Sequence, residues 1–151
     1  MKNSLIVVLK LLLLFIGLNI IRYFIIGPIE MQIVLGPLFG AMEQSPAYFN
    51  SNFTTIDWIT SYTYNFLMWL GTVLAYHFME ASLNGRPIVK SLKVYALMWL
   101  LFASISAIYM NHYTHPKDFY IYSILDAALV FMLVGTANGF LYPLLIKRKQ
   151  T

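Results

Sequence analysis

Four long apolar segments divide the chain into stretches that each match the thickness of a lipid bilayer. They cover residues 5–26, 56–82, 88–110 and 119–146. A helix needs about 20 apolar residues to cross the hydrocarbon core, and backbone polar groups in lipid are satisfied only in helices or closed barrels. We therefore predict an all-α integral membrane protein, a four-helix bundle formed by a single transmembrane domain over residues 1–151.

The composition excludes most classes of soluble protein. Hydrophobic residues make up 60% of the chain and charged residues 11%, whereas charged residues make up about 25% of a typical soluble protein. A small soluble domain leaves much of its surface exposed and could not hide this much apolar area. The lipid bilayer is therefore the first predicted partner. Cysteine is absent, which excludes disulfides, thiolate metal ligands and cysteine nucleophiles.

The distribution of Lys and Arg predicts the orientation of the bundle. Eight of the ten basic residues fall on one side of the four segments: Lys2, Lys10, Arg86, Lys90, Lys93, Lys147, Arg148 and Lys149. Only Arg22 and Lys117 fall toward the other side. Because cytoplasmic connections carry the excess of basic residues, both termini are predicted to be cytoplasmic. We expect a multi-pass protein of the bacterial inner (cytoplasmic) membrane.

The connection between the first two spans, residues 27–55, contains a second apolar stretch. Residues 31–42 are apolar but too short to span a bilayer. Gly36-Pro37 is expected to break any helix there, because proline lacks the backbone donor and clashes with the preceding turn. The stretch is predicted to be either an interfacial helix on the outer face of the bundle or a re-entrant loop that lines a cavity.

Two charged residues lie within the predicted spans at similar depths. At 1.5 Å of rise per residue, Arg22 lies about 8 Å from the outer end of the first span and Asp126 about 11 Å from that of the last. Three interpretations of Arg22 are open: it extends to the headgroups, it pairs with Asp126, or it binds an anionic group or responds to a proton on Asp126. Asn19 lies on the same helical face as Arg22 and is a further polar candidate.

Polar and aromatic residues follow one face of the second span. They are Ser61, Asn65, Trp69, Thr72, Tyr76 and Glu80, at steps of three and four residues. A stripe of this kind is expected to face the bundle, where it either forms hydrogen bonds between helices or lines a ligand groove. His77 lies three residues before Glu80, and both could titrate near the cytoplasmic end.

The last span carries a pattern of small residues on one face. Ala128, Gly135 and Gly139 share this face, and two glycines four residues apart let helix backbones approach closely. Asp126 lies about half a turn away from Gly135. The last span is therefore predicted to be contacted on two sides, either from a central position or across a dimer.

The sequence motifs of several enzyme classes are missing. No nucleophile-elbow, P-loop, Rossmann or HExxH motif occurs in the chain. His112 and His115 could contribute to a metal site with Asp118, but no third ligand is specified. We predict neither a metal nor a cofactor. Nucleic-acid binding is not expected, since the basic residues form short groups beside the membrane.

Three functions are open on these observations. The preferred one is a non-catalytic accessory, assembly or scaffold component of a membrane complex. The second is an oligomeric small-solute carrier, coupled to ions or protons, in which the polar stripe and the Arg22/Asp126 pair line a path. The third is a membrane enzyme that acts on a lipid-like substrate, with Glu80, His77 or Asp126 as acid or base. Homo-oligomers or larger membrane complexes are the expected assemblies.

Overall fold

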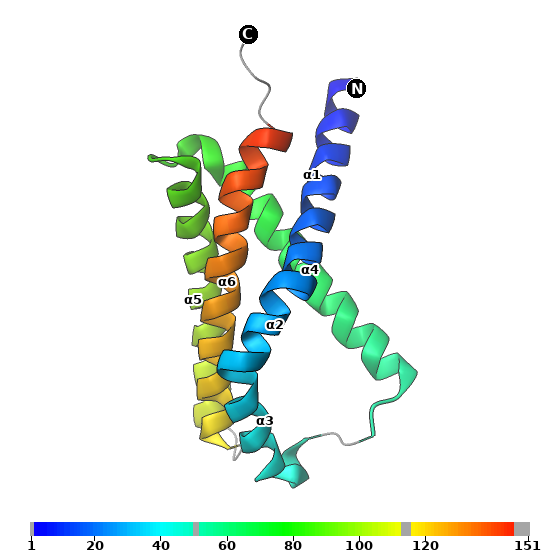
Figure 1. Ribbon diagram of the computed structural model, residues 1–151, viewed down its shortest axis with the longest axis vertical. Coiled ribbons are helices and arrows are strands. Elements are labelled where there is room, and N and C mark those ends of the chain that lie inside the picture. Colours follow the sequence, from blue (N-terminus) through cyan, green and yellow to red (C-terminus); the bar gives the residue numbers. More distant parts are fainter. Residues whose placement is uncertain (1, 50–51, 113–115, 147–151) are drawn as a thin grey trace.

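Helices account for the regular structure of the described chain (Figure 1). The computed structural model describes residues 2–49, 52–112 and 116–146. Three helical stretches are long and apolar enough to cross a membrane, namely Leu5–Glu43, Pro87–His112 and Lys117–Leu145. The prediction of an all-α protein with membrane-spanning helices is therefore confirmed at this level.

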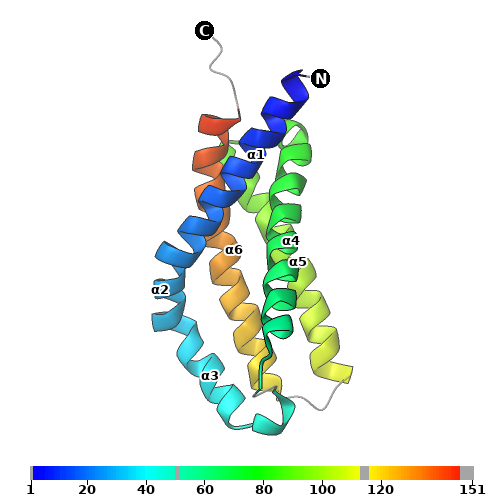
Figure 2. The same ribbon diagram turned by 90° about the vertical axis from the view of Figure 1, so that its right-hand side faces the viewer.

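The first stretch is one bent helix that is far longer than the sequence predicts. It consists of α1 (Lys2–Ile21), α2 (Gly27–Glu30) and α3 (Gly36–Glu43). Two π-helical turns, Arg22–Ile26 and Met31–Leu35, join these parts without a break. Figure 2 shows how the helix bends between α1 and α3.

The two Gly-Pro pairs lie directly after the π turns, and this explains why they do not end the helix. In a π turn a backbone N–H reaches the carbonyl five residues back, as Gly27 does to Arg22. This wider spacing accommodates Pro28 and Pro37, which in a regular helix would clash with the carbonyl four residues earlier. The predicted break at Gly36-Pro37 is therefore wrong. Residues 31–42 are not a separate interfacial or re-entrant piece; they continue the first helix and pack against α6.

The remaining helices are α4 (Thr55–Met79), α5 (Pro87–His112) and α6 (Lys117–Leu145). The most extensive contact joins α5 and α6, which form an antiparallel hairpin, and α1 packs against α6. The start of α1 and the end of α6 lie together at one end of the molecule, here called the near end (Figure 1). The opposite end, where α6 begins, is called the far end.

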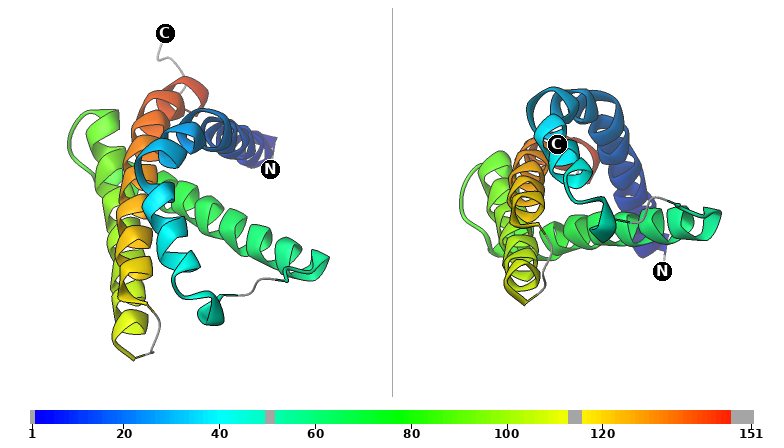
Figure 3. Two further views of the ribbon diagram at one scale, coloured as in Figure 1. Left: turned by 60° about the horizontal axis from the view of Figure 1, so that its bottom comes forward. Right: turned by 90° about the horizontal axis from the view of Figure 1, so that it is seen from below.

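The helix α4 diverges from the other helices toward the far end of the molecule. It begins with a capping box in which Thr54 and Asp57 bond each other's backbone N–H groups. Its near half packs into the core, whereas its far half points away from α5 and α6 (Figure 3). Side chains on several sides of the far half are exposed, including Ile56, Ile59 and Tyr64. Side chains of this far half line a cavity between α4 and the other helices.

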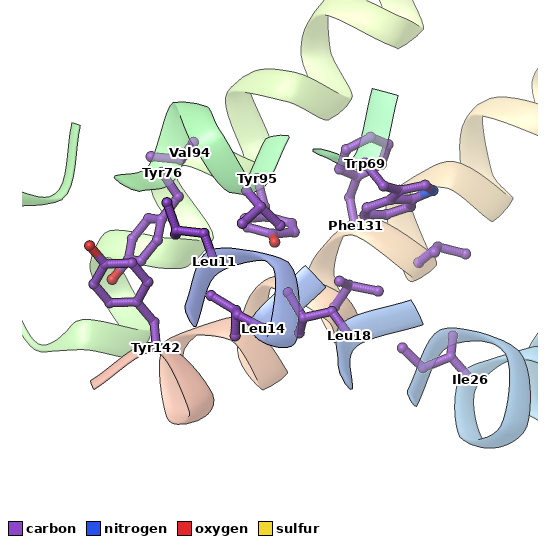
Figure 4. Close-up of a cluster of buried hydrophobic side chains, with 13 residues drawn as sticks. Leu11, Leu14, Leu18, Ile26, Trp69, Tyr76, Val94, Tyr95, Phe131 and Tyr142 are labelled. Atoms are coloured by element: carbon purple, nitrogen blue, oxygen red, sulfur yellow. The ribbon is translucent and has the colours of Figure 1, made fainter. Parts of the chain in front are cut away.

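The near half of the molecule holds a core of aliphatic and aromatic side chains (Figure 4). Trp69 stacks on Phe131 with ring centroids 4.7 Å apart. Tyr76 meets Tyr142 edge to face at 4.8 Å, and Leu14 of α1 is fully buried beside them. Val94 and Tyr95 of α5 belong to the same cluster, which therefore ties α1, α4, α5 and α6 together.

The small-residue face of α6 lies against α5. A β-carbon added to Gly139 would lie 2.5 Å from Cα of Ile88, and one added to Gly135 would lie 2.9 Å from the side chain of Tyr95. Ser91 donates a hydrogen bond to the Gly135 carbonyl at 2.7 Å and accepts one from Asn138 at 2.9 Å. Ala128, two turns earlier, is half-buried. Within one chain this face is thus occupied by α5, so it is not free to form a dimer.

Candidate functional site

A cavity of about 480 Å³ lies beside the far half of α4. Its walls come from the bent first helix, α4, α5 and α6. The polar groups that line it are Arg22, Glu30, Ser61, Asn65, Ser123 and Asp126, and the aromatic groups are Tyr23, Trp58, Tyr62, Trp69, Phe102 and Phe131. A cavity of this size with a few convergent polar groups matches the usual form of a small-molecule site.

Arg22 is held in place by α4. Its side chain is 7% exposed, and its Nη2 donates a hydrogen bond of 2.6 Å to Oδ1 of Asn65. The guanidinium carbon lies 5.0 Å from the ring centroid of Trp69 and 4.3 Å from that of Tyr23, within cation–π distance. Nη1 is buried without an acceptor among the described residues. The structure thus rules out the interpretation in which Arg22 extends to the headgroups.

Asp126 lies beside a different residue from the one expected. Its carboxyl group and that of Glu30 line the same cavity, and its Oδ1 is buried without a hydrogen-bond partner among the described residues. Within the described part of the chain the ion pair that forms is Lys90–Glu80, so the predicted direct pair between Arg22 and Asp126 is wrong. The two residues nevertheless line the same cavity.

The continuation of the first helix explains why Glu30 was overlooked. If the helix ended near residue 26, Glu30 would lie in the outer connection. Because the chain stays helical, Glu30 follows Arg22 by eight positions, and the π turn between them adds one residue to the regular spacing. Seven regular positions make about two turns, so the two side chains return to one face. A prediction that the first helix continues through Gly27-Pro28 would have placed Glu30 on the same face as Arg22.

The stripe on α4 divides between two roles. Its far part, Ser61, Asn65 and Trp69, lines the cavity. Its near part is packed: the Thr72 hydroxyl bonds the Met68 carbonyl at 2.9 Å, and the Tyr76 hydroxyl bonds the Pro87 carbonyl at 3.3 Å. The far part of the stripe therefore agrees with the ligand-groove interpretation, and the near part agrees with the interpretation of hydrogen bonds between helices.

The other polar candidates lie outside the main cavity. Nδ1 of His77 is 2.8 Å from the Tyr142 hydroxyl, and Glu80 pairs with Lys90 at 3.1 Å. Asn19 donates a hydrogen bond of 2.9 Å to the Phe15 carbonyl of its own helix. His77 and Glu80 thus join neighbouring helices, whereas Asn19 bonds within its own helix. Of the predicted polar residues, Arg22, Ser61, Asn65 and Asp126 line the main cavity.

One histidine of the predicted pair lies within the described residues. His112 bonds the Ile108 carbonyl through Nδ1 at 2.9 Å, and His115 lies outside the described residues. Within residues 2–49, 52–112 and 116–146 no group of three or more His, Asp or Glu is placed to hold a metal ion.

The chain matches no protein-family model, and no curated protein or solved structure is significantly similar to it. The chemistry of the site is therefore argued from its own residues.

Proposed function

We propose that the protein is a membrane carrier that binds a small organic solute in the far-end cavity. The observation that supports this most strongly is the convergence of Arg22, Glu30 and Asp126 on one cavity of about 480 Å³ with aromatic walls. Charged groups inside a membrane domain are costly, and they commonly mark the path of a solute or an ion. Small-molecule sites have volumes of about 300–1,000 Å³.

The orientation of the carrier is part of the same proposal. With α4 as a fourth span, the near end faces the cytoplasm of a bacterial cell and the far-end cavity faces outward, as the basic residues favour. Because the chain has no cysteine, single cysteines report the sides directly. In intact cells, a maleimide that cannot cross the membrane is expected to label Asp118→Cys and to leave Asn84→Cys unlabelled. The reverse pattern would contradict the orientation.

A bulky side chain in the cavity is expected to abolish solute binding. Ser61 lines the cavity from an exposed position on α4, so Ser61→Phe fills the space without displacing packed side chains. Trp58 and Trp69 also line it, and their fluorescence in the detergent-purified protein reports binding during a screen of small organic solutes. Solutes that shift the fluorescence of the wild type should bind Ser61→Phe at least about tenfold more weakly, since a lost cavity removes most of their burial.

The matched control is Thr60→Phe, at the neighbouring exposed position that does not line the cavity. It should bind the same solutes as the wild type does. Equal weakening in both variants would contradict the assignment of the site. Uptake into proteoliposomes by the wild type and not by Ser61→Phe would establish transport as well as binding.

The accessory or scaffold hypothesis stays a prediction from the sequence. The exposed far half of α4 could contact a partner or a second copy, and the mass of the native protein in mild detergent would reveal either one. The enzyme hypothesis also stays a prediction from the sequence. Of its three candidate residues, His77 and Glu80 are engaged at the near end, away from the cavity, and Asp126 lines it.

A further inference from the structure

We propose that the cavity selects small organic amines, bound as ammonium ions in exchange for one proton held between Glu30 and Asp126. This inference rests on the proposed function, because it assigns a substrate class and a coupling ion to the same cavity. It follows from the charges of the site, from the groups left without partners, and from the aromatic walls.

The charges of the cavity leave room for one additional cation. Arg22 contributes one positive charge, and ionised Glu30 and Asp126 contribute two negative charges, so the three residues together carry one net negative charge. Glu30 and Asp126 are half-buried, and an uncompensated charge within a membrane domain is unfavourable. One proton on the carboxyl pair neutralises the site, and one ammonium ion in its place does the same. The two cations should therefore exchange one for one.

Glu30 and Asp126 line the same cavity, and both are half-buried. Two ionised carboxylates in one site repel each other, and one proton shared between them relieves this repulsion. When an ammonium ion binds, this proton leaves to water and both carboxylates face the ligand. No covalent bond changes in the exchange.

Arg22 is not the counterion of the two carboxyl groups, so they can bind a cationic ligand. It forms no ion pair with either carboxyl group within the described chain, and it is held by Asn65 and by the face of Trp69. Oδ1 of Asp126 is buried and accepts no hydrogen bond from the described residues. It is therefore available to accept one from the N–H of an amine, which a quaternary ammonium could not supply.

The walls of the cavity favour a cation with an apolar body. Trp58, Tyr62 and Phe131 join Trp69 around the cavity. Aromatic faces attract cations, and they also bury aliphatic or aromatic carbon atoms. A cavity of about 480 Å³ accommodates an arylalkyl amine rather than a bare metal ion.

The other groups that line the cavity support the assignment of the exchanged proton to Glu30 and Asp126. The first helix contributes Arg22 and Tyr23 to the cavity, α4 contributes Tyr62, and α5 contributes Phe102, which has no titratable group. Among the described residues that line the cavity, Glu30 and Asp126 are the carboxyl groups.

The experiment uses the full chain in detergent with 2-phenylethylammonium as the probe and 2-phenylethanol as its neutral isostere. The fluorescence of Trp58 and Trp69 follows binding, and a pH indicator in weak buffer follows released protons. We expect tighter binding of the ammonium ion and release of one proton for each ion bound. At pH values at which the carboxyl pair is protonated, the affinity for the ammonium ion should fall about tenfold for each unit of decreasing pH, by linkage.

The variant Glu30→Gln removes one negative charge and leaves Arg22 and Asp126 neutral together. The ratio of ammonium to alcohol affinity should fall at least about tenfold, and proton release should disappear, since the variant needs no extra cation. The control Glu43→Gln removes an exposed carboxylate outside the cavity and should behave as the wild type does. Helix content by circular dichroism establishes that both variants are folded.

Several results would overturn the inference. Ammonium binding without proton release, or with an unchanged ratio in Glu30→Gln, would remove the carboxyl pair from the exchange. Tighter binding of phenylalanine than of 2-phenylethylammonium would favour a zwitterion whose carboxylate meets Arg22. In each case the cavity still binds a solute, so the proposed function survives. Its own failure would appear separately, as binding that Ser61→Phe does not weaken.

Discussion

Replacing Gly139 with alanine should lower the free energy of unfolding by about 2–3 kcal/mol, within the range of overpacked cores. The added methyl group would lie 2.5 Å from Cα and 3.0 Å from the backbone nitrogen of Ile88. Backbone atoms cannot rotate away as a flexible side chain can, so α5 and α6 must separate. These helices form the most extensive contact of the fold. Unfolding in mixed detergent micelles, followed by circular dichroism while SDS is titrated in, measures the loss.

The matched control is Gly17→Ala in α1, where a β-carbon would meet nothing within 4 Å. Alanine is favoured over glycine in a helix by about 0.5–1 kcal/mol, so this variant should be as stable as the wild type or slightly more stable. Equal losses at both positions would show that the effect belongs to glycine replacement in general and not to the contact with α5.

Replacing Lys90 with methionine should lower the free energy of unfolding by about 3 kcal/mol, the lower end of the range for breaking a buried ion pair. The Lys90 ammonium lies 3.1 Å from Oε1 of Glu80 and also donates to the Glu80 carbonyl at 2.9 Å. The two side chains are 15% and 9% exposed. Without Lys90, the Glu80 carboxylate loses its ammonium partner in a largely dry position beside the turn between α4 and α5. The same SDS titration measures the change.

A second substitution separates the charge from the packing. In the background of Lys90→Met, Glu80→Gln removes the charge that lost its counterion, so most of the stability should return. A double variant that is no more stable than Lys90→Met would mean that the lysine acts through its aliphatic chain and not through its ammonium group.

The helical segments could be predicted from the sequence because their signals are local. The predicted span 88–110 corresponds to α5, and 119–146 corresponds to α6 within a few residues. The spacing of Gly135 and Gly139 predicted a close approach, and the structure places α5 there. Apolar length and residue size specify these features without knowledge of the partners.

The candidate site could be predicted only in part, because it depends on how helices meet. Charge and depth predict Arg22 and Asp126, but Arg22 bonds Asn65, and Asp126 shares its cavity with Glu30. Proline preferences predicted that the first helix ends before Glu30, whereas the π turns relieve the steric clash and let it continue along α6. The divergence of α4 is likewise a balance among contacts between helices, which no local pattern records.

The geometry of α4 means that a small rotation about its middle moves its first residues over a much larger distance. Its firm contacts lie at Trp69 and beyond, while Asn65 and Phe66 touch the first helix and the side chains from Thr55 to Ser61 are mostly exposed. The arm from Trp69 to Thr55 is 14 residues, or about 21 Å. A rotation of 10° about Trp69 would thus move the tip by about 4 Å, given the same rise per residue. A small rotation near the middle of α4 would therefore be amplified at Trp58 and Ser61, which line the cavity.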